Sequence, residues 1–391
     1  MLHEDWIDPS ARRIVHILQT AGYESFLVGG CVRDLLAGIH PKDFDIATNA
    51  LPNEVKRKVP GSYVIGKRFR LVLVKRGEQQ FEVATFRRNI TAEESANEDN
   101  PVVGDNYFGT VEEDALRRDF TINALFYDPI NNSLIDYVEG KKDISCRTIR
   151  MIGDPKERFI EDPIRILRAL RLSHKLNFSL EPSLRRAMTE TAAELLKSAL
   201  PRRREEYLKI LRLKEPGRAW AELFDLGILH QTVPALDELY SNPDESLLFE
   251  NLLLEIPRIG IDLGSPLELF AGFLYAFMKA RDPEAANEPS TIESSPRWNA
   301  FMKDELGMFK VEMAVFVKCL ELIPALSRIS SYEKKGQRRK LGFLRNDSLP
   351  LALKLSQMDG AIGPQEFMFW INEIRKNSEE MWNTRPEPDL D

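Results

Sequence analysis

Residues that build covalent or metal-bound frameworks are scarce in this chain. Among its 391 residues there are three cysteines and five histidines. The cysteines stand far apart and form no Cys-x-x-Cys pair, which argues against a disulfide framework and a cysteine zinc site. The histidines show no His-Glu-x-x-His or similar spacing, so the sequence indicates no histidine metal site either.

Long apolar runs and an excess of positive charge are also missing. No run approaches the roughly 18 apolar residues of a membrane span. The first residues, Met-Leu-His-Glu-Asp-Trp, contain no apolar signal region. The net charge of −7 argues against indiscriminate coating of nucleic acid, while it leaves room for local basic tracks. We therefore expect a cytoplasmic protein without a membrane partner; the oligomeric state has no signature in the sequence.

What remains is the composition of a globular protein, with 43% hydrophobic and 29% charged residues. The length predicts roughly two to four units. Strands and helices alternate up to about Met151, whereas almost every later segment has helical period and is punctuated by proline. The sequence predicts an α+β chain with a mixed head at 1–150, a helical neck at 151–215, a helical body at 216–330 and a helical tail at 331–391.

Local signals predict individual elements. Asp8-Pro-Ser10 fits the cap of a helix, and Thr110-Val-Glu-Glu113 fits a capping box that opens a helix carrying Leu116-Arg-Arg-Asp119. Strands are expected at 26–28, 44–46, 64–65, 70–75 and 80–86, and helices from near Pro163, Pro182 and Pro201. We expect a mobile loop at 90–107, a linker or surface loop at 282–297 and a disordered end at 385–391.

A glycine pair stands in Leu27-Val-Gly-Gly-Cys-Val-Arg-Asp34, directly after an apolar strand signal. Bare glycines let backbone N–H groups approach a phosphate, and the helix that they open adds its positive end. Gly29 and Gly30 are therefore candidates for holding a phosphate. A strand-to-helix turn can also use glycine for geometry alone, and the Rossmann and P-loop fingerprints are absent.

Two aspartates alternate in Lys42-Asp-Phe-Asp-Ile-Ala-Thr48. In a strand, Asp43 and Asp45 point to one face and can share hard cations. Like charges on one strand face repel each other unless a cation lies between them, although Asp alone is also common in caps and Asx-turns. Glu82 stands in a further apolar strand. It is a candidate third acid, with a solvent-facing strand residue as the alternative.

Two charged segments place donors beside acceptors. Asp119 and Asn123 are neighbours if Arg117-Arg118-Asp119 continues as a helix. Asp162, Arg165 and Arg168 form a row at i, i+3 spacing. A carboxylate beside a guanidinium can hydrogen-bond the edge of a base, whereas the alternative is an ordinary ion pair within a helix.

Three basic clusters are candidates for tracks that follow a nucleic-acid backbone. They are Arg202-Arg-Arg204, Lys334-Lys335 with Arg338-Arg-Lys340, and Lys67-Arg68 with Arg70. For each, a solvated helix face is the alternative.

Together these motifs resemble the class II nucleotidyltransferases, which comprise the tRNA CCA-adding enzymes and the bacterial poly(A) polymerases. The order is Gly-Gly-x-x-Arg-Asp, Asp-x-Asp, a lone strand Glu, Arg-Arg-Asp-x-x-x-Asn and Glu-Asp-x-x-Arg. The resemblance covers roughly residues 20 to 240. It implies a polymerase-β-like nucleotidyltransferase head followed by helical neck, body and tail.

The resemblance also implies roles for residues. Asp43 and Asp45 would bind two Mg²⁺ ions, with Glu82 as the third acid, while the RNA 3′-hydroxyl attacks the α-phosphate and pyrophosphate leaves. Asp162 and Arg165 would read the base, and the loop within 90–105 would couple closure to catalysis. The implied nucleotide-binding set is Gly29, Gly30, Arg33, Arg118, Asp119, Asn123, Asp162, Arg165 and Arg168.

The branch of the family is harder to predict. The stretches 64–71, 81–87 and 201–211 look like those of bacterial poly(A) polymerases, so ATP and RNA 3′ ends are the expected substrates. Leu73 stands where those polymerases usually have His, and the end of the chain is acidic. Addition of CCA, C or A to tRNA, with CTP as a further substrate, is therefore the alternative. A non-catalytic RNA-binding module is the third hypothesis.

Overall fold

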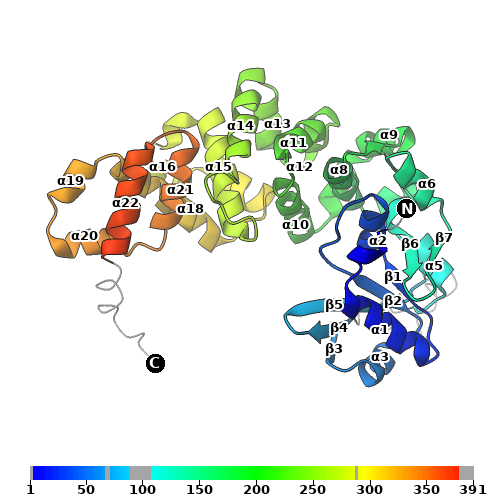
Figure 1. Ribbon diagram of the computed structural model, residues 1–391. Helices are drawn as coiled ribbons and strands as arrows, with labels where there is room; N and C mark the ends of the chain where they lie inside the picture. Colours follow the sequence, from blue (N-terminus) through cyan, green and yellow to red (C-terminus); the bar gives the residue numbers. More distant parts are fainter. Residues whose placement is uncertain (1–2, 67–70, 89–106, 287–288, 378–391) are drawn as a thin grey trace, which may run out of the picture. The chain divides into compact units, whose positions relative to one another are not determined.

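The computed structural model describes residues 3–66, 71–88, 107–286 and 289–377 (Figure 1). The chain divides into two compact units. Unit 1 consists of Met1–Arg165 with Leu176–Met188, and unit 2 consists of Ile166–Lys175 with Thr189–Asp391. Of the helices in these described segments, none combines the length and the apolar character that a membrane crossing requires.

Unit 1 is built on a seven-stranded mixed sheet in the order β3-β4-β5-β2-β1-β6-β7. All neighbouring strands are antiparallel except β2 and β5, which run parallel. Strands β2 and β5 belong to different antiparallel parts of the sheet. Their parallel pairing therefore brings together acidic residues that are far apart in the sequence. The strands are β1 (Ser25–Val28), β2 (Asp45–Thr48), β3 (Ser62–Ile65), β4 (Leu71–Arg76), β5 (Gln79–Thr85), β6 (Leu125–Asp128) and β7 (Ser133–Asp136).

Both faces of this sheet are covered, and every residue of β1 is buried. Helices α1 (Pro9–Thr20) and α3 (Pro52–Lys58) pack together against one face. On the other, three aromatic rings from β1, the end of β5 and β6 pack beside α5 (Val111–Leu116): Phe26, Phe86 and Phe126 lie 6.1–6.4 Å apart between centroids. This double burial fixes the ends of β1 and β2, where the candidate site lies.

The remaining elements of unit 1 are short and surround one end of the sheet. They are η1 (Glu4–Trp6), α2 (Gly30–Leu36), η2 (Thr121–Asn123), α6 (Gly140–Ser145), β8 (Thr148–Ile149), α7 (Pro155–Glu161), β9 (Ser179–Leu180) and α9 (Pro182–Glu190). Strands β8 and β9 form a separate parallel pair. Strand β9 is the exception, among the described residues, to the all-helical pattern predicted after residue 154.

Unit 2 is helical, and α15 (Pro266–Arg281) is its centre because its residues from Leu269 to Met278 are buried without a break. Helices α10, α14, α18 and α21 pack against it. Its elements are α8 (Arg165–Leu176), η3 (Ala192–Lys197), α10 (Leu200–Leu211), α11 (Pro216–Asp225), α12 (Ile228–Thr232), α13 (Pro234–Tyr240), α14 (Pro243–Glu255), α15, η4 (Pro283–Ala286), α16 (Pro289–Ser294), α17 (Pro296–Asn299), η5 (Ala300–Glu305), α18 (Lys310–Leu326), α19 (Ile329–Glu333), α20 (Gln337–Leu344), α21 (Leu349–Met358) and α22 (Pro364–Lys376).

The predicted α+β class, with a mixed-sheet head and helical later parts, is confirmed. Helix α1 begins after the Asp8 cap as expected, and β2 begins at Asp45, one residue later than predicted. The loop at 282–297 is a wrong prediction, because η4, α16 and α17 form there, each starting at a proline that suits a first helical turn. Most of the loop predicted at 90–107, and all of the end at 385–391, lie outside the described residues. The division into four domains stays a prediction.

Two further helix predictions are wrong for local reasons. Helix α5 ends at Leu116, so the segment Arg117–Asp119 lies beyond it. Asp162 has extended backbone (φ −146°, ψ 91°) because it precedes a proline, whose ring disfavours the helical conformation there. Asp162 therefore stands between α7 and α8 and is not in one helical row with Arg165 and Arg168.

Candidate active site

The site lies where β1, β2 and β5 meet at one end of the sheet. Val28, the last residue of β1, pairs with Asp45, the first residue of β2. Asp45 in turn pairs with Glu82 across the parallel β2–β5 contact. The chain turns directly after Val28 at Gly29, whose N–H donates to the Leu125 carbonyl at 3.2 Å. The glycine turn and two of the predicted acids are thus brought to one place.

The carboxylates form a local concentration of negative charge. Asp43, Asp45 and Glu82 are all exposed, and Asp43 precedes β2, so the two aspartates do not share one strand face as predicted. Partial burial of its carboxyl group, followed by repulsion from Glu82, raises the pKa of Asp45 to about 6; Arg118 opposes the shift and Asp43 adds to it. The three carboxylates therefore lie close enough to interact.

The donor chemistry of this cluster fits Mg²⁺, which prefers oxygen ligands. Within residues 3–66, 71–88, 107–286 and 289–377, no group of three or more His, Cys, Asp or Glu side chains is arranged to hold a metal ion. Mg²⁺ is usually held by one or two carboxylates together with substrate phosphates, and does not need a cage of protein ligands. Asp43 and Asp45 are the two carboxylates predicted for such a site, and their role as metal ligands stays a prediction.

The turn at Gly29 requires glycine because its backbone, with φ +74° and ψ −125°, lies in a region that residues with a β-carbon rarely adopt. Arg118 lies next to this turn, since a β-carbon on Gly29 would be in ordinary contact, at 3.4 Å, with its Nη1. Because the Gly29 N–H is already bonded to Leu125, the N–H group next available to an anion is that of Gly30, the first residue of α2. First-turn N–H groups have no carbonyl partner within their own helix. The phosphate contact predicted for Gly29 and Gly30 stays a prediction, and the N–H of Gly30 is the better placed of the two for it.

Arg33 is buried and connects α2 to the segment before β6. Its Nη1 donates to Oδ1 of Asn123 at 2.7 Å, and its Nε donates to Asp34 at 2.8 Å. Asn123 also donates through Nδ2 to Oδ1 of Asp119 at 3.2 Å. The predicted neighbours Asp119 and Asn123 are therefore in contact, although through an irregular segment and the short η2 instead of an α-helix.

Arg118 is held in place by a buried acid that the sequence motif did not include. Asp114 accepts from Nη2 of Arg118 at 2.7 Å, and the guanidinium lies 5.2 Å above the ring of Phe126. Burial of Asp114 raises its pKa, but Arg118 and Arg117 outweigh that effect, so the pKa lies below its ordinary value. A signal was available, because Asp114 and Arg118 have the i, i+4 spacing of a helical ion pair.

Arg158, at the middle of α7, is a second residue that sequence reasoning missed. Its Nη2 donates to the carbonyls of Arg117 and Arg118, both at 2.8 Å. These carbonyl oxygens therefore bind a side chain and not the N–H groups that would extend helix α5. Its Nη1 pairs with Glu161 at 2.6 Å, and Glu161 also pairs with Arg165 at 2.8 Å. One guanidinium thus links the Arg118 segment to the predicted base-reading Arg165. The sequence carries no signal for contacts to backbone carbonyls 40 residues away.

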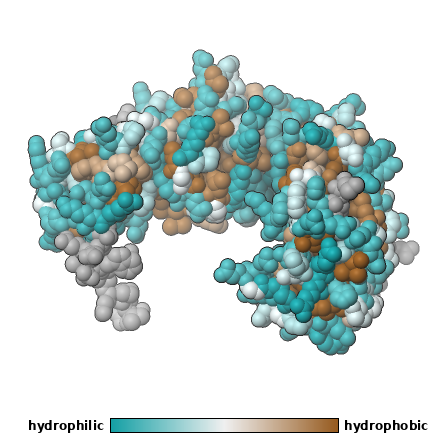
Figure 2. Space-filling view, viewed as in Figure 1, coloured by the Kyte–Doolittle hydropathy of each residue, from teal (hydrophilic) through white to brown (hydrophobic). Residues whose placement is uncertain are grey.

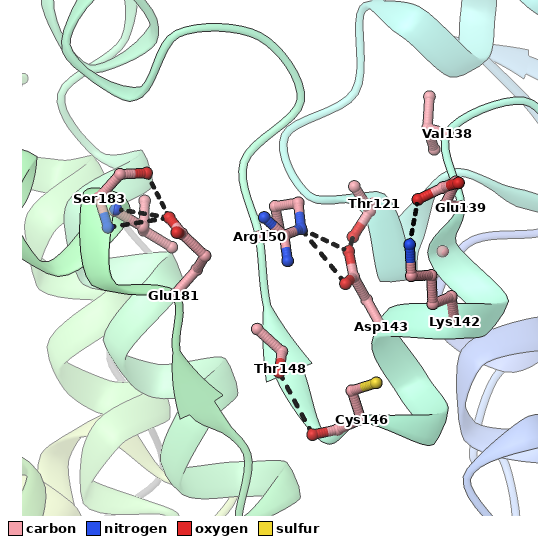
Figure 3. A network of polar contacts seen from close by, with 12 residues as sticks. Thr121, Val138, Glu139, Lys142, Asp143, Cys146, Thr148, Arg150, Glu181 and Ser183 are labelled. Atoms are coloured by element: carbon pink, nitrogen blue, oxygen red, sulfur yellow. Dashed lines mark hydrogen bonds and ion pairs between the residues drawn. The ribbon is translucent and has the colours of Figure 1, made fainter.

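A polar network holds η2 from its other side (Figure 3). Oγ1 of Thr121 donates to the buried Asp143 at 2.7 Å, and Nε of Arg150 donates to the same carboxylate at 3.1 Å. A β-carbon on Gly140 would lie 2.2 Å from the Thr121 carbonyl oxygen, so α6 packs tightly on this turn. The Arg117–Asn123 segment is therefore fixed at both ends.

The predicted row of Asp162, Arg165 and Arg168 is divided between the units. Asp162 and Arg165 belong to unit 1, where Glu161 and Arg158 hold Arg165. Arg168 belongs to unit 2. The roles of all three remain predictions.

The first predicted basic track is mostly buried. In α10, Arg203 and Arg204 are only 7% and 6% exposed. Arg204 pairs with Glu312 at 2.5 Å, and its guanidinium lies 4.6 Å from the ring of Phe309. The prediction of a basic track at this position is therefore wrong, because two of its three cations are buried in the core of unit 2. Lys67, Arg68 and Arg70 lie outside the described residues.

Comparison with known proteins assigns this arrangement of residues to a family. Residues 25–150 match the family model of the poly A polymerase head domain, and residues 177–240 match the model described as the probable RNA and SrmB-binding site of polymerase A. Poly(A) polymerase I of Haemophilus influenzae is 38% identical over 274 residues, which cover 68% of this chain and 60% of the relative. The chain belongs to the class II nucleotidyltransferase family.

Other members of the family resemble the chain over similar or greater lengths. The CCA-adding enzyme of Lactobacillus delbrueckii is 33% identical over 265 residues, 66% of each protein. The Thermotoga maritima CCA-adding enzyme, solved in complex with tRNA, shares the fold with a TM-score of 0.60 and 23% identity, covering 99% of this chain and 89% of that one. The match spans about 60% of the length of the poly(A) polymerase relatives.

Proposed function

We propose that this chain is a template-independent RNA 3′-terminal nucleotidyltransferase that adds AMP from ATP to RNA 3′ ends and releases pyrophosphate. The observation that supports this most strongly is the convergence of a glycine turn, paired carboxylates and Arg118 at the end of β1 and β2. Each element of that convergence serves one part of nucleotidyl transfer: holding a triphosphate, holding a cation and neutralising charge.

In this proposal the residues of the site share the work of positioning. Gly30 N–H and Arg118 bind the triphosphate, and Asn123 and Asp119 orient the ribose and phosphates from the segment that Arg158 holds. Asp43 and Asp45, with Glu82 beside them, would hold Mg²⁺; when bound, the metal activates the 3′-hydroxyl and balances the charge of the departing pyrophosphate. Asp162 and Arg165 select the base by hydrogen bonds to its edge.

Addition of CCA, C or A to tRNA is the alternative activity. CCA-adding enzymes are among the relatives, at 33–36% identity. Poly(A) polymerases are matched at up to 38% and over a slightly larger share of the chain, which favours the first activity. The substrates proposed are therefore ATP and RNA in general, with CTP and tRNA ends as the alternative pair. A cytoplasmic location, where both RNA and ATP are available, is part of the proposal.

One comparison separates these activities. A tRNA that lacks CCA and an unrelated RNA are each incubated with Mg²⁺ and either ATP or CTP, and the products are sized. The proposal expects long A-tails on both RNAs and negligible use of CTP. CTP incorporation confined to the tRNA would contradict the poly(A) proposal. Retention of RNA without pyrophosphate release would leave only a binding module.

A further inference from the structure

The second predicted basic cluster lies in unit 2, far along the chain from the family matches. Residues 328–345 contain seven lysines and arginines and one acid, Glu333, in a chain with a net charge of −7. They form α19, the loop after it and α20. The cations that make up this basic face are Arg328, Lys334, Lys335, Arg338, Arg339 and Lys340, which are exposed apart from the half-buried Lys340.

The charge of this face is not neutralised by its own neighbours. Within the parts of the chain that the structure describes, Lys334, Arg338 and Arg339 take part in no ion pair. An ordinary solvated helix face carries acids at i, i+3 or i, i+4 positions that compensate its cations. Glu373, one of the two acids on α22, accepts a hydrogen bond from Tyr332 at 3.0 Å and forms no ion pair with these three cations in the described residues. The excess positive charge is thus left facing solvent.

A hollow of about 180 Å³ opens beside the same face. Arg328, Ser331 and Lys335 line it together with Phe343, and Nζ of Lys335 lies 5.6 Å from the centroid of the Phe343 ring. The hollow is smaller than pockets for whole organic ligands, which start near 300 Å³. It has room for one phosphate or the edge of one base. The ring of Phe343 is half-buried, and cations beside an aromatic ring are typical of single-stranded nucleic acid sites.

The surroundings of the basic face favour RNA over a membrane. A membrane-binding surface needs large exposed apolar side chains next to its cations. No large hydrophobic side chain of the described α19 and α20 is among the strongly exposed ones. In Figure 2 the end of the chain where Figure 1 labels α19 and α20 is largely hydrophilic.

We propose that the basic face of α19 and α20 binds the phosphate backbone of the RNA substrate, upstream of the 3′ end that is extended. The identity of the ligand as RNA rests on the proposed function. The chemistry, several cations without an ion pair on α20 and the loop before it beside a small aromatic hollow, fits a single strand bound mainly through its phosphates.

The test compares two triple variants of the full chain. Lys334→Gln, Arg338→Gln and Arg339→Gln remove three cations but keep Lys335 and Lys340, which contact aromatic rings. Lys56→Gln, Arg57→Gln and Lys58→Gln, on α3, are the control, because these cations are also exposed and have no ion pair in the described residues. Binding of a fluorescent 30-nucleotide RNA is measured by anisotropy over a series of salt concentrations, together with AMP incorporation.

The basic-face variant should bind RNA about tenfold more weakly, and the slope of log K against log salt should fall by about 2, since each single-strand phosphate contact contributes roughly 0.7. The KM for RNA should rise while kcat stays unchanged, and the α3 control should match the wild type. The proposal would be overturned if the basic-face variant bound RNA as tightly as the α3 control, whether both variants matched the wild type or both lost affinity equally. Displacement of the bound RNA by an acidic peptide at the same concentration of negative charge would also overturn it.

The two levels of the proposal fail in different ways. If the wild-type chain extends no RNA, the proposed function is wrong. If it extends RNA but the basic-face variant keeps the wild-type KM and salt slope, the inference about α19 and α20 alone is wrong.

Discussion

At the scale of residues, the site depends on a few positions at which one atom decides the geometry. Gly29 turns the chain at the end of β1 with a backbone conformation that favours glycine, and Arg118 lies beside it. Asp45 starts β2 directly beside Val28 and Glu82. Arg118 is in turn aimed by Asp114. A change at any of these positions should alter the substrate-binding groups more than it alters the fold.

Gly29→Ala tests the turn that places Arg118 beside the end of β1. Alanine at φ +74° and ψ −125° strains the backbone by roughly 1–3 kcal/mol, and a turn that relaxes this strain shifts the groups around it. We expect AMP incorporation to fall at least tenfold. Gly38→Ala is the control for a positive-φ glycine that follows α2, because Gly38 has φ +71° and nothing within 4 Å of a β-carbon. Equal loss of activity in both variants would show that the turn at Gly29 has no special part in the site.

Arg158→Lys tests the link between the Arg118 segment and Arg165. Lysine cannot bridge two carbonyls and Glu161 at once, because it lacks the planar fork of the guanidinium. We expect a several-fold increase in the KM for ATP with little change in the unfolding midpoint. Arg258→Lys should have no effect, since Arg258 forms an exposed pair with Glu255. An unchanged KM in Arg158→Lys would contradict a positioning role.

At the scale of elements, the irregular segment between α5 and β6 is held by groups from the helices around it. Arg158 of α7 binds its start, and Asp143 and Gly140 of α6 bind its end (Figure 3). Asp114 ties it back to α5. The segment therefore keeps a non-helical shape because side chains replace the missing helical hydrogen bonds.

The contribution of Asp114 to the stability of this segment should depend on pH, and Asp114→Asn tests that dependence. The pKa of Asp114 is lowered in the folded chain, so its stabilisation is complete above about pH 4 and is lost as the pH falls through the folded value. At pH 7 the variant should lose about 2 kcal/mol, the usual size for a hydrogen bond to a charged group. The difference in urea midpoint between the two proteins should shrink steadily as the pH falls below about 4, the ordinary pKa of an aspartic acid. A difference that stays constant as the pH is lowered through the acid range would rule out ionised Asp114 as the cause.

At the scale of the whole molecule, the sequence predicted what depends on local pattern. Strand alternation, the Asp8 and Thr110 caps and the α+β class follow from residues close together in the chain. It could not predict the partners of Arg158, nor the burial of Arg204, whose partner Glu312 is 108 residues away. Such contacts depend on tertiary packing, which overrides the local expectation that an arginine cluster faces solvent.

The proposed function requires that Asp45, beside Gly29 and Glu82, belongs to a centre for metal-dependent nucleotidyl transfer. The most direct measurement is AMP incorporation and pyrophosphate release by Asp45→Asn, with circular dichroism to show that the variant is folded and anisotropy to show that it binds RNA. We predict a loss of at least about a hundredfold in kcat with RNA affinity retained. A folded Asp45→Asn protein that extends RNA at the wild-type rate would contradict the proposed function.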